Sequence, residues 1–117
     1  VIDSKGSYLG GMIIPGVNVS LNALTAGTSQ LPKINLEPPK KVISSNTVDC
    51  MKSGIIFGQA SLIDGVIDRF EEELGQKCTV IATGGLSGSI IPYCKRNVIH
   101  DKDLLLKGLI KIYEKNK

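Results

Sequence analysis

The segment between Asn46 and Gly75 carries the longest helical pattern in the chain, and it constrains the fold most. Its apolar residues recur alternately four and three positions apart, which places them on one face of a helix: Ile56, Ala60, Ile63, Ile67, Phe70 and Leu74. Asn46 is a favoured N-cap, and Asp49 follows it by three residues in a capping-box arrangement. Gly75 is a typical C-terminal stop. The pattern predicts a helix, in one or two pieces, that ends at Leu74.

The same helix carries a second stripe, made of small residues: Gly54, Gly58, Ser61 and Gly65. Each glycine inside a helix costs about 1 kcal/mol relative to alanine, so the stripe calls for an explanation. Small side chains let another backbone approach closely. The neighbour is either another part of the same subunit or a helix of a second subunit, and the sequence leaves both open. Asp64, Asp68 and Arg69 exclude a membrane-spanning helix here.

Before this helix, the chain reads as a hairpin, a short helix and an extended connection. Val1–Ile2 and Ser7 to Ile14 are predicted to be the two arms of the hairpin. Val17 to Ala26 has apolar residues at helical spacing. Residues Leu31 to Lys41 contain Pro32, Pro38 and Pro39, which favour an extended connection.

After the long helix, the pattern changes to strands and shorter helices. Cys78–Ala82 is predicted to be a buried strand, followed by a turn at Thr83-Gly84-Gly85 and a short helix limited by Pro92. Val98–Ile99 is predicted to be a short edge strand. Asp103 is expected to cap a last helix whose inward residues are Leu105, Leu106, Leu109, Ile110 and Tyr113. Strands that alternate with helices indicate an α/β fold.

Composition excludes several classes of protein. A chain of 117 residues is one domain at most, and a net charge of +3 is too small to indicate nucleic-acid binding. The basic residues of the C-terminal region read as a solvated helix face rather than a phosphate-binding patch. No apolar run is long enough for a membrane span, and no signal peptide is visible.

The cysteines and the single histidine do not form a recognisable site. Cys50, Cys78 and Cys94 lack C-x-x-C spacing, which argues against both a disulfide framework and a zinc site. They are expected to be reduced, in a cytoplasmic protein. His100 is the only histidine, so a nucleophile–histidine pair would have to use it; without a G-x-S-x-G context it is expected to lie in a solvent-facing loop.

Four stretches together resemble one family. They are YLGGMIIPGVNVSLNAL (8–24), NTVDCMKSGIIFGQASLIDGVIDR (46–69), VIATGGL (80–86) and LLLKGLIKIYEKN (104–116). In this order and spacing they look like the C-terminal half of bacterial type III pantothenate kinases. The resemblance implies an enzyme that phosphorylates pantothenate with ATP and Mg²⁺, assisted by a monovalent cation (K⁺ or NH₄⁺), in the first step of coenzyme A biosynthesis. It also implies a homodimer.

The implied fold is that of the acetate and sugar kinase, Hsp70 and actin superfamily. Residues 1–117 would form the C-terminal ribonuclease-H-like half of an actin-like ATPase fold, with a mixed sheet flanked by helices. The partner of this half would be the N-terminal half of the same protein. The C-terminal half itself would also lack its first strand. The chain is therefore expected to be a fragment that does not fold autonomously, with a foreign strand bonded along Cys78–Ala82.

The resemblance assigns three site residues. Gly84 and Gly85 would lie beside the adenosine of the nucleotide, because a backbone without side chains gives a planar base access. A plain strand-to-helix turn that needs a positive φ explains the same glycines, and it is compatible with the adenosine role. Thr47 would contact pantothenate, with the alternative that it is an ordinary first-turn residue next to the Asn46 cap.

No catalytic residue and no metal ligand is assigned to this chain. The family's phosphate motifs (D-x-G-N-T and D-F-G-T-A-T-T) and its G-A-D-R motif, which holds the proposed catalytic base, are absent from it. Asp3 lacks their glycine-threonine context. Two other functions stay open: a non-catalytic regulator of the transcriptional accessory factor type that keeps the fold, and another kinase of the superfamily.

Overall fold

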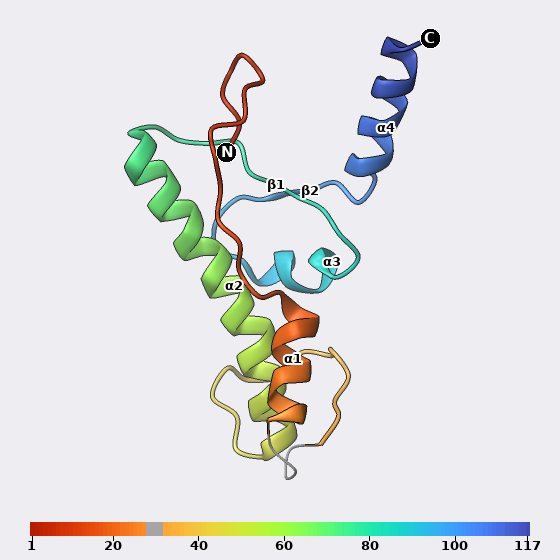
Figure 1. Cartoon of the computed structure of the whole chain (residues 1–117). Coiled ribbons are helices and arrows are strands. Elements are labelled where there is room, and N and C mark those ends of the chain that lie inside the picture. The colour runs from red at the N-terminus through yellow and green to blue at the C-terminus, as the bar shows by residue number, and fades with distance from the viewer. Residues whose placement is uncertain (28–31) are drawn as a thin grey trace.

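The computed structural model describes residues 1–27 and 32–117, and Figure 1 shows their arrangement. The elements in chain order are α1 (Val17–Ala26), α2 (Thr47–Leu74), β1 (Ile81–Ala82), α3 (Ser87–Ile90), the 3₁₀ turn η1 (Ile91–Tyr93), β2 (Ile99–His100) and α4 (Leu104–Lys115). The predicted helix at Val17–Ala26 is confirmed. Residues 32–41 contain no helix or strand, as predicted, whereas Leu31 at the start of that connection lies outside the described residues.

Helix α2 forms in one piece, and both of its predicted ends are confirmed. The side-chain oxygen of Asn46 accepts a hydrogen bond from the backbone N–H of Asp49 at 2.9 Å. The Asn46 amide in turn donates to the Asp49 carboxylate at 2.9 Å. At the other end, Gly75 adopts a left-handed conformation with φ of 69°, and its N–H bonds to the carbonyl oxygen of Glu71. This is a conformation that glycine adopts without strain.

The core of the molecule lies where α1 and α3 pack against α2, and these three helices are here called the helical body (Figure 1). Ile56 is completely buried at its centre. The buried residues of this core come from all three helices: Val17, Ile55, Ile56, Ala60 and Ile90. Of the predicted apolar stripe of α2, Ile56, Ala60 and Ile67 are buried, and Ile63, Phe70 and Leu74 are half-buried.

The N-terminal hairpin is much shorter than predicted. Its turn is present, since Val1 accepts a hydrogen bond from the Leu9 N–H at 2.9 Å and Ile2 forms an antiparallel bridge with Tyr8. The Val1 amino group also donates to the carbonyl oxygen of Gly10 at 2.6 Å. The prediction of a strand through to Ile14 is wrong beyond Gly10, because no backbone hydrogen bond joins residues 11–14 to another described segment, and Ile13 is fully exposed. A strand persists only where a neighbour accepts its hydrogen bonds.

The sheet consists of β1 and β2, which pair in parallel with Ala82 opposite His100. The prediction of a buried strand at Cys78–Ala82 is therefore wrong in length and in burial, because only Ile81–Ala82 pairs and Ile81 is half exposed. The reason is that β2 satisfies one edge of β1, and no described strand pairs with the other edge. The second predicted strand forms one residue later, at Ile99–His100. The predicted α/β class is confirmed, in the sense that helices and a short parallel sheet are both present.

The last helix, here called the C-terminal arm, projects away from the helical body (Figure 1). The prediction that its apolar residues point inward is wrong, because every residue of α4 is exposed: Leu105, Leu106, Leu109, Ile110 and Tyr113 are 53–73 % exposed. The prediction of an Asp103 cap is also wrong, since its side chain makes no capping bond. The radius of gyration is 17.1 Å, whereas a compact domain of this size has about 13 Å, so the described chain is extended.

A cluster of charges ties the segment after η1 to α2. Asp64 accepts from the backbone N–H of Arg96 at 2.9 Å, and the Arg96 guanidinium bonds to Asp68 and Glu71. Glu71 also accepts from the N–H of Cys78 at 3.0 Å. The Arg96 hydrogen bond, followed by that of Cys78, holds the pKa of the Glu71 carboxyl below its ordinary value. The carboxylate thus joins α2 to both chain segments that flank the sheet.

The small-residue stripe of α2 faces open space within the described residues. Apart from the neighbouring backbone of the helix itself, no described atom lies within 4 Å of a Cβ placed at Gly54, Gly58 or Gly65. Close packing against residues 1–27 or 32–117 therefore does not account for these glycines. None of the described helices is both long and apolar enough to span a membrane.

Candidate functional site

The turn between β1 and α3 is confirmed, and its geometry requires glycine at one position. Gly84 has φ of 109°, a region that other L-residues rarely adopt. Its carbonyl oxygen accepts two hydrogen bonds from Ser87, one from the hydroxyl at 2.7 Å and one from the backbone N–H at 3.3 Å. Apart from the adjacent residues of the chain, a Cβ at Gly84 or Gly85 would meet no described atom within 4 Å. The turn is thus conformationally demanding, and its backbone also faces open space.

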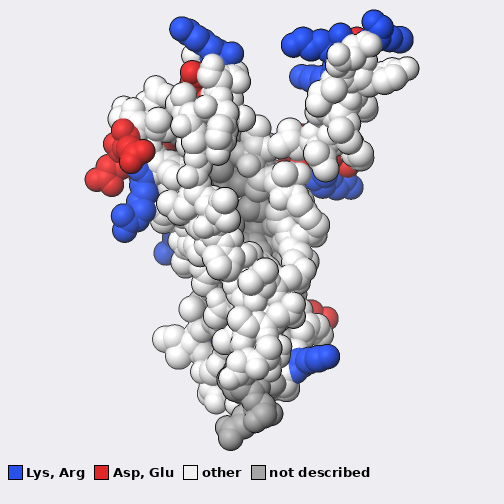
Figure 2. All heavy atoms as spheres, in the orientation of Figure 1, with Lys and Arg blue, Asp and Glu red and all other residues white. Residues whose placement is uncertain are grey.

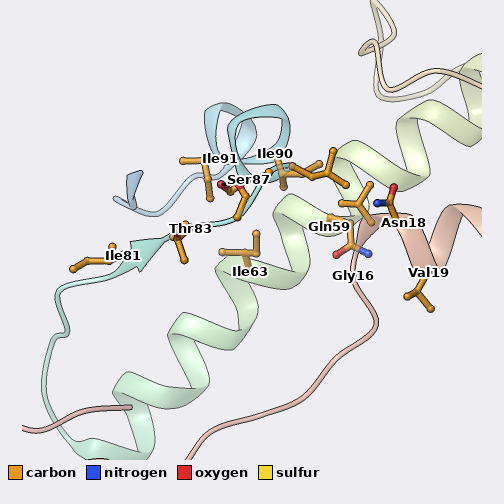
Figure 3. Close-up of a pocket in the computed structure, with 15 residues that line it drawn as sticks. Gly16, Asn18, Val19, Gln59, Ile63, Ile81, Thr83, Ser87, Ile90 and Ile91 are labelled. Atoms are coloured by element: carbon orange, nitrogen blue, oxygen red, sulfur yellow. Dashed lines mark hydrogen bonds between the residues drawn. The ribbon is translucent and has the colours of Figure 1, made fainter. Parts of the chain in front are cut away.

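This turn borders a cavity with a volume of about 730 Å³. Its walls come from the start of α1, the middle of α2 and the segment from β1 to η1, as Figure 3 shows. The volume lies within the range of small-molecule sites. Gly84 and Gly85 therefore both line a cavity that could hold a ligand, as the adenosine assignment requires.

The chemistry of this cavity suits an uncharged, largely apolar group. Ile63, Ile81 and Ile90 supply apolar surface, and Asn18 and Gln59 supply amide groups. None of the described residues that line the cavity has a charged side chain. A planar base fits such walls, whereas Mg²⁺ does not, because it requires oxygen ligands that usually include carboxylates.

The described residues outside this cavity do not supply a metal site or a phosphate-binding patch either. Among the described residues, no cluster of three His, Cys, Asp or Glu side chains could hold a metal ion. Figure 2 shows basic side chains both on the outer part of the arm and at its base. One of them, Lys107, pairs with Asp101 at 2.8 Å, and this hydrogen bond lowers the pKa of the Asp101 carboxyl. The basic residues of the arm thus behave as a solvated helix face.

The structure reveals a serine–histidine contact beside the cavity that sequence reasoning missed. His100 is exposed as expected, but it lies in β2 rather than in a loop, and its Nε2 is 2.8 Å from the Ser87 hydroxyl. Because that hydroxyl donates its one proton to the carbonyl of Gly84, it accepts from Nε2–H of His100. His100 is therefore not placed as a base for Ser87. Only the parallel pairing of β1 and β2 could have revealed this contact.

Thr47 lines a different cavity, of about 490 Å³, at the start of α2. The remaining walls are Leu24, Ser45, Asn46, Cys50, Met51 and Gly54. Thr47 is exposed and is the first residue of α2, where free backbone N–H groups favour a carboxylate. A hydrogen bond from the Ser53 hydroxyl to the carbonyl oxygen of Val42 ties the segment before Thr47 to α2.

The structure does not bring Thr47 next to the glycine turn. Thr47 and Gln59, which line the two cavities, are both on α2. At 1.5 Å per residue they are about 18 Å apart along the helix axis. A substrate at Thr47 and a base at the turn would occupy opposite parts of the helical body.

The three cysteines are free, as expected. Burial, and to a smaller extent the charge of Asp64, raises the pKa of the Cys94 thiol. Its sulfur packs at the edge of the core. Among the described residues, none of these three cysteines forms a disulfide bond.

Comparison with known proteins gives consistent matches. The family model described as type III pantothenate kinase matches residues 1–69. A type III pantothenate kinase of Rubrobacter xylanophilus is 45 % identical over 121 residues, which cover 98 % of this chain and 46 % of the relative. Those of Moorella thermoacetica and Acidothermus cellulolyticus are 43 % and 39 % identical, and each is covered to 45 % of its length.

The chain thus spans about half the length of the curated relatives that it matches. The family model covers more than half of the chain, including α1, the Asn46 cap and most of α2. The remaining motifs, among them the glycine turn, lie within the stretch aligned with the relatives. The chain belongs to the type III pantothenate kinase family.

Proposed function

We propose that this chain acts as the C-terminal part of an ATP-dependent pantothenate kinase in the first step of coenzyme A biosynthesis. The observation that carries the proposal is the match to this family along nearly the whole chain, at about 40 % identity. All the relatives named above are described as kinases. The alternative of a transcriptional accessory factor has no comparable support.

Two sites in the chain would contribute to this reaction. The glycine turn at Gly84 and Gly85 would lie against the adenosine of ATP, supported by the open, uncharged cavity beside it. Thr47 would contact pantothenate, supported by the cavity at the start of α2. The hydroxyl can donate a hydrogen bond, and the free N–H groups of the first turn favour the carboxylate of pantothenate.

The phosphoryl-transfer machinery would lie outside these 117 residues. Such transfer needs phosphate-binding loops, metal ions and a group that positions the nucleophile. The described walls of the cavity carry no carboxylate, so we place the ligands of Mg²⁺ and of the monovalent K⁺ or NH₄⁺ in another part of the protein. The role of this chain is to bind and orient the two substrates.

That other part would be an N-terminal half of the same protein, in the cytoplasm, and together they would form an actin-like ATPase fold. The chain's own half would be ribonuclease-H-like. Two surfaces support this partner: the edge of β1 that no described strand pairs with, and the exposed apolar residues of the arm. An unpaired edge with apolar neighbours is normally covered. A strand bonded along β1 would complete the sheet.

We also propose a homodimer in which the Gly54–Gly58–Gly65 stripe of α2 meets the partner. Its support is the open space above these glycines, which described residues do not fill. A Gly58→Leu substitution should separate the subunits, and a Gln76→Leu substitution elsewhere on the surface serves as the control. Sedimentation that shows an intact dimer for Gly58→Leu would contradict this placement.

Steady-state kinetics of the complete kinase test the proposed function. Loss of one hydrogen bond in Thr47→Ala should cost about 1–3 kcal/mol, which is roughly a 5- to 150-fold loss in kcat/KM for pantothenate. The KM for ATP should stay within about twofold, and Thr47→Ser should retain most of the activity. Unchanged kinetics for pantothenate would make Thr47 an ordinary first-turn residue. The 117-residue chain alone should show no turnover with ATP, Mg²⁺ and K⁺.

A further inference from the structure

The glycine turn is held by a chain of hydrogen bonds that begins on a different strand. His100 Nε2 lies 2.8 Å from the Ser87 hydroxyl, which lies 2.7 Å from the carbonyl oxygen of Gly84. The Ser87 N–H adds a second, longer bond to the same carbonyl. Three residues thus connect β2, the start of α3 and the peptide that follows Gly84.

The direction of these bonds follows from the number of protons. Ser87 has one hydroxyl proton, and at 2.7 Å it goes to the carbonyl of Gly84, which can only accept. The Ser87 oxygen is then an acceptor toward His100, so Nε2 carries a proton in the neutral and in the charged ring. The histidine therefore orients the serine hydroxyl toward the turn.

Two further features explain why the imidazole ring of His100 can lie beside the start of α3. The register of the sheet sets His100 opposite Ala82, two residues before Gly84. A Cβ at Gly88 would lie 3.3 Å from Cε1 of the imidazole, which is a tight contact. Glycine at position 88 therefore leaves room for the ring to lie against the first turn of α3.

The conformation of Gly84 is one that needs such support. A φ of 109° is open to glycine, but an unsupported glycine turn also samples many other conformations. Fixing the Gly84 carbonyl removes part of this freedom before a ligand arrives. A turn that is already ordered loses less conformational entropy on binding.

We propose that His100 is a positioning residue for the nucleotide site: through Ser87 it fixes the Gly84 carbonyl and holds the glycine turn in the shape that receives the base. The inference rests on the proposed function for its ligand. The hydrogen-bond chain itself does not depend on that function. The histidine would touch neither the phosphates nor pantothenate, so its effect should be confined to nucleotide binding.

The test compares His100→Ala with His100→Gln and Ser87→Ala in the complete kinase. Loss of the histidine should raise the KM for ATP and the Kd for ADP, measured by calorimetry, by about three- to tenfold. The kcat should change by less than about twofold, and the KM for pantothenate should not change. The glutamine side chain of H100Q would place an amide N–H near the position of Nε2, so this variant should recover at least part of the affinity.

A double-mutant cycle shows whether the histidine acts through the serine. If it does, the His100→Ala, Ser87→Ala double variant should bind ADP about as weakly as Ser87→Ala alone. Additive losses would overturn the proposal, and so would a Kd for ADP that stays within about twofold in His100→Ala. Melting temperatures identify any variant that fails to fold, and H100Q then provides the comparison.

A second measurement needs no activity. Hydrogen exchange of the unliganded protein should become several-fold faster at residues 83–88 in His100→Ala, with no change in the middle of α2. Unchanged exchange in the turn would overturn the proposal. If the wild-type protein does not phosphorylate pantothenate, the proposed function fails, while the exchange data still decide whether His100 fixes the turn.

Discussion

The helical body and the C-terminal arm carry similar apolar patterns but have opposite environments. Ile56 on α2 is 0 % exposed, whereas Ile110 on α4 is 56 % exposed. Both helices form where their sequences predict them. The difference is that α1 and α3 cover the apolar face of α2, and no described element covers that of α4.

The ends of the two helices differ in the same way. Asn46 caps α2 with its side chain, whereas the Asp103 side chain at the corresponding position of α4 makes no capping bond. The N–H of Asp103 instead donates to Asp101 at 3.1 Å. A periodic pattern thus predicts that a helix exists, but burial and precise ends depend on what the helix packs against.

The largest effect is expected in the helical body. Ile56→Ala removes a completely buried side chain and should lower the free energy of unfolding of the complete kinase by about 2–5 kcal/mol. Ile43→Ala, at a position that is 89 % exposed, is the matched control and should change it by less than about 0.5 kcal/mol. Urea denaturation measures both. Similar values for the two variants would mean that Ile56 is not the centre of the core.

The arm offers the equivalent substitution at Ile110. If the N-terminal half covers the arm, Ile110→Ala should destabilise the complete kinase by about 1–3 kcal/mol, although the residue is exposed in the chain by itself. Lys111→Ala on the same helix is the control and should be nearly neutral. A cost below about 0.5 kcal/mol in the same urea experiment would show that the arm remains free in the whole protein.

The contrast also explains what the sequence could predict. The bounds of α2 follow from Asn46 and Gly75, which act on the backbone next to them. The burial of α4 and the length of β1 were predicted wrongly, because both depend on neighbours beyond the local pattern. The edge of β1 that faces away from β2 has no described partner, so that only Ile81–Ala82 forms a strand.

In the candidate site, too, features set by the local sequence could be predicted and those that depend on distant residues could not. Gly84 could be predicted as a turn residue from its own context, and its φ of 109° agrees with that. The assignments of Gly84, Gly85 and Thr47 to ligands came from the family resemblance and remain predictions. The contact between Ser87 and His100 spans thirteen positions and depends on the parallel register of β1 and β2, which no local pattern indicates.

The smallest expected effect is a contribution to stability that is lost only at acid pH. It compares two ion pairs, Glu71–Arg96 in the body and Asp101–Lys107 in the arm. The pKa of the Glu71 carboxyl is lowered in the folded state, chiefly by the Arg96 hydrogen bond. Its contribution is therefore fully present above the ordinary pKa of 4.5 and is lost as pH falls through the folded value.

Urea denaturation between neutral and acid pH measures this contribution. Glu71→Gln should be less stable than wild type near neutral pH, and the gap should narrow as pH falls below 4.5. Asp101→Asn should show a smaller gap, because Lys107 is 60 % exposed and salt and solvent screen that pair. A Glu71→Gln gap that stays constant with pH would show that the charge of the carboxylate is not the source of the gap, since the glutamine oxygen can still accept from the Cys78 N–H. The ion pair with Arg96 would then contribute little to holding the sheet segment against α2.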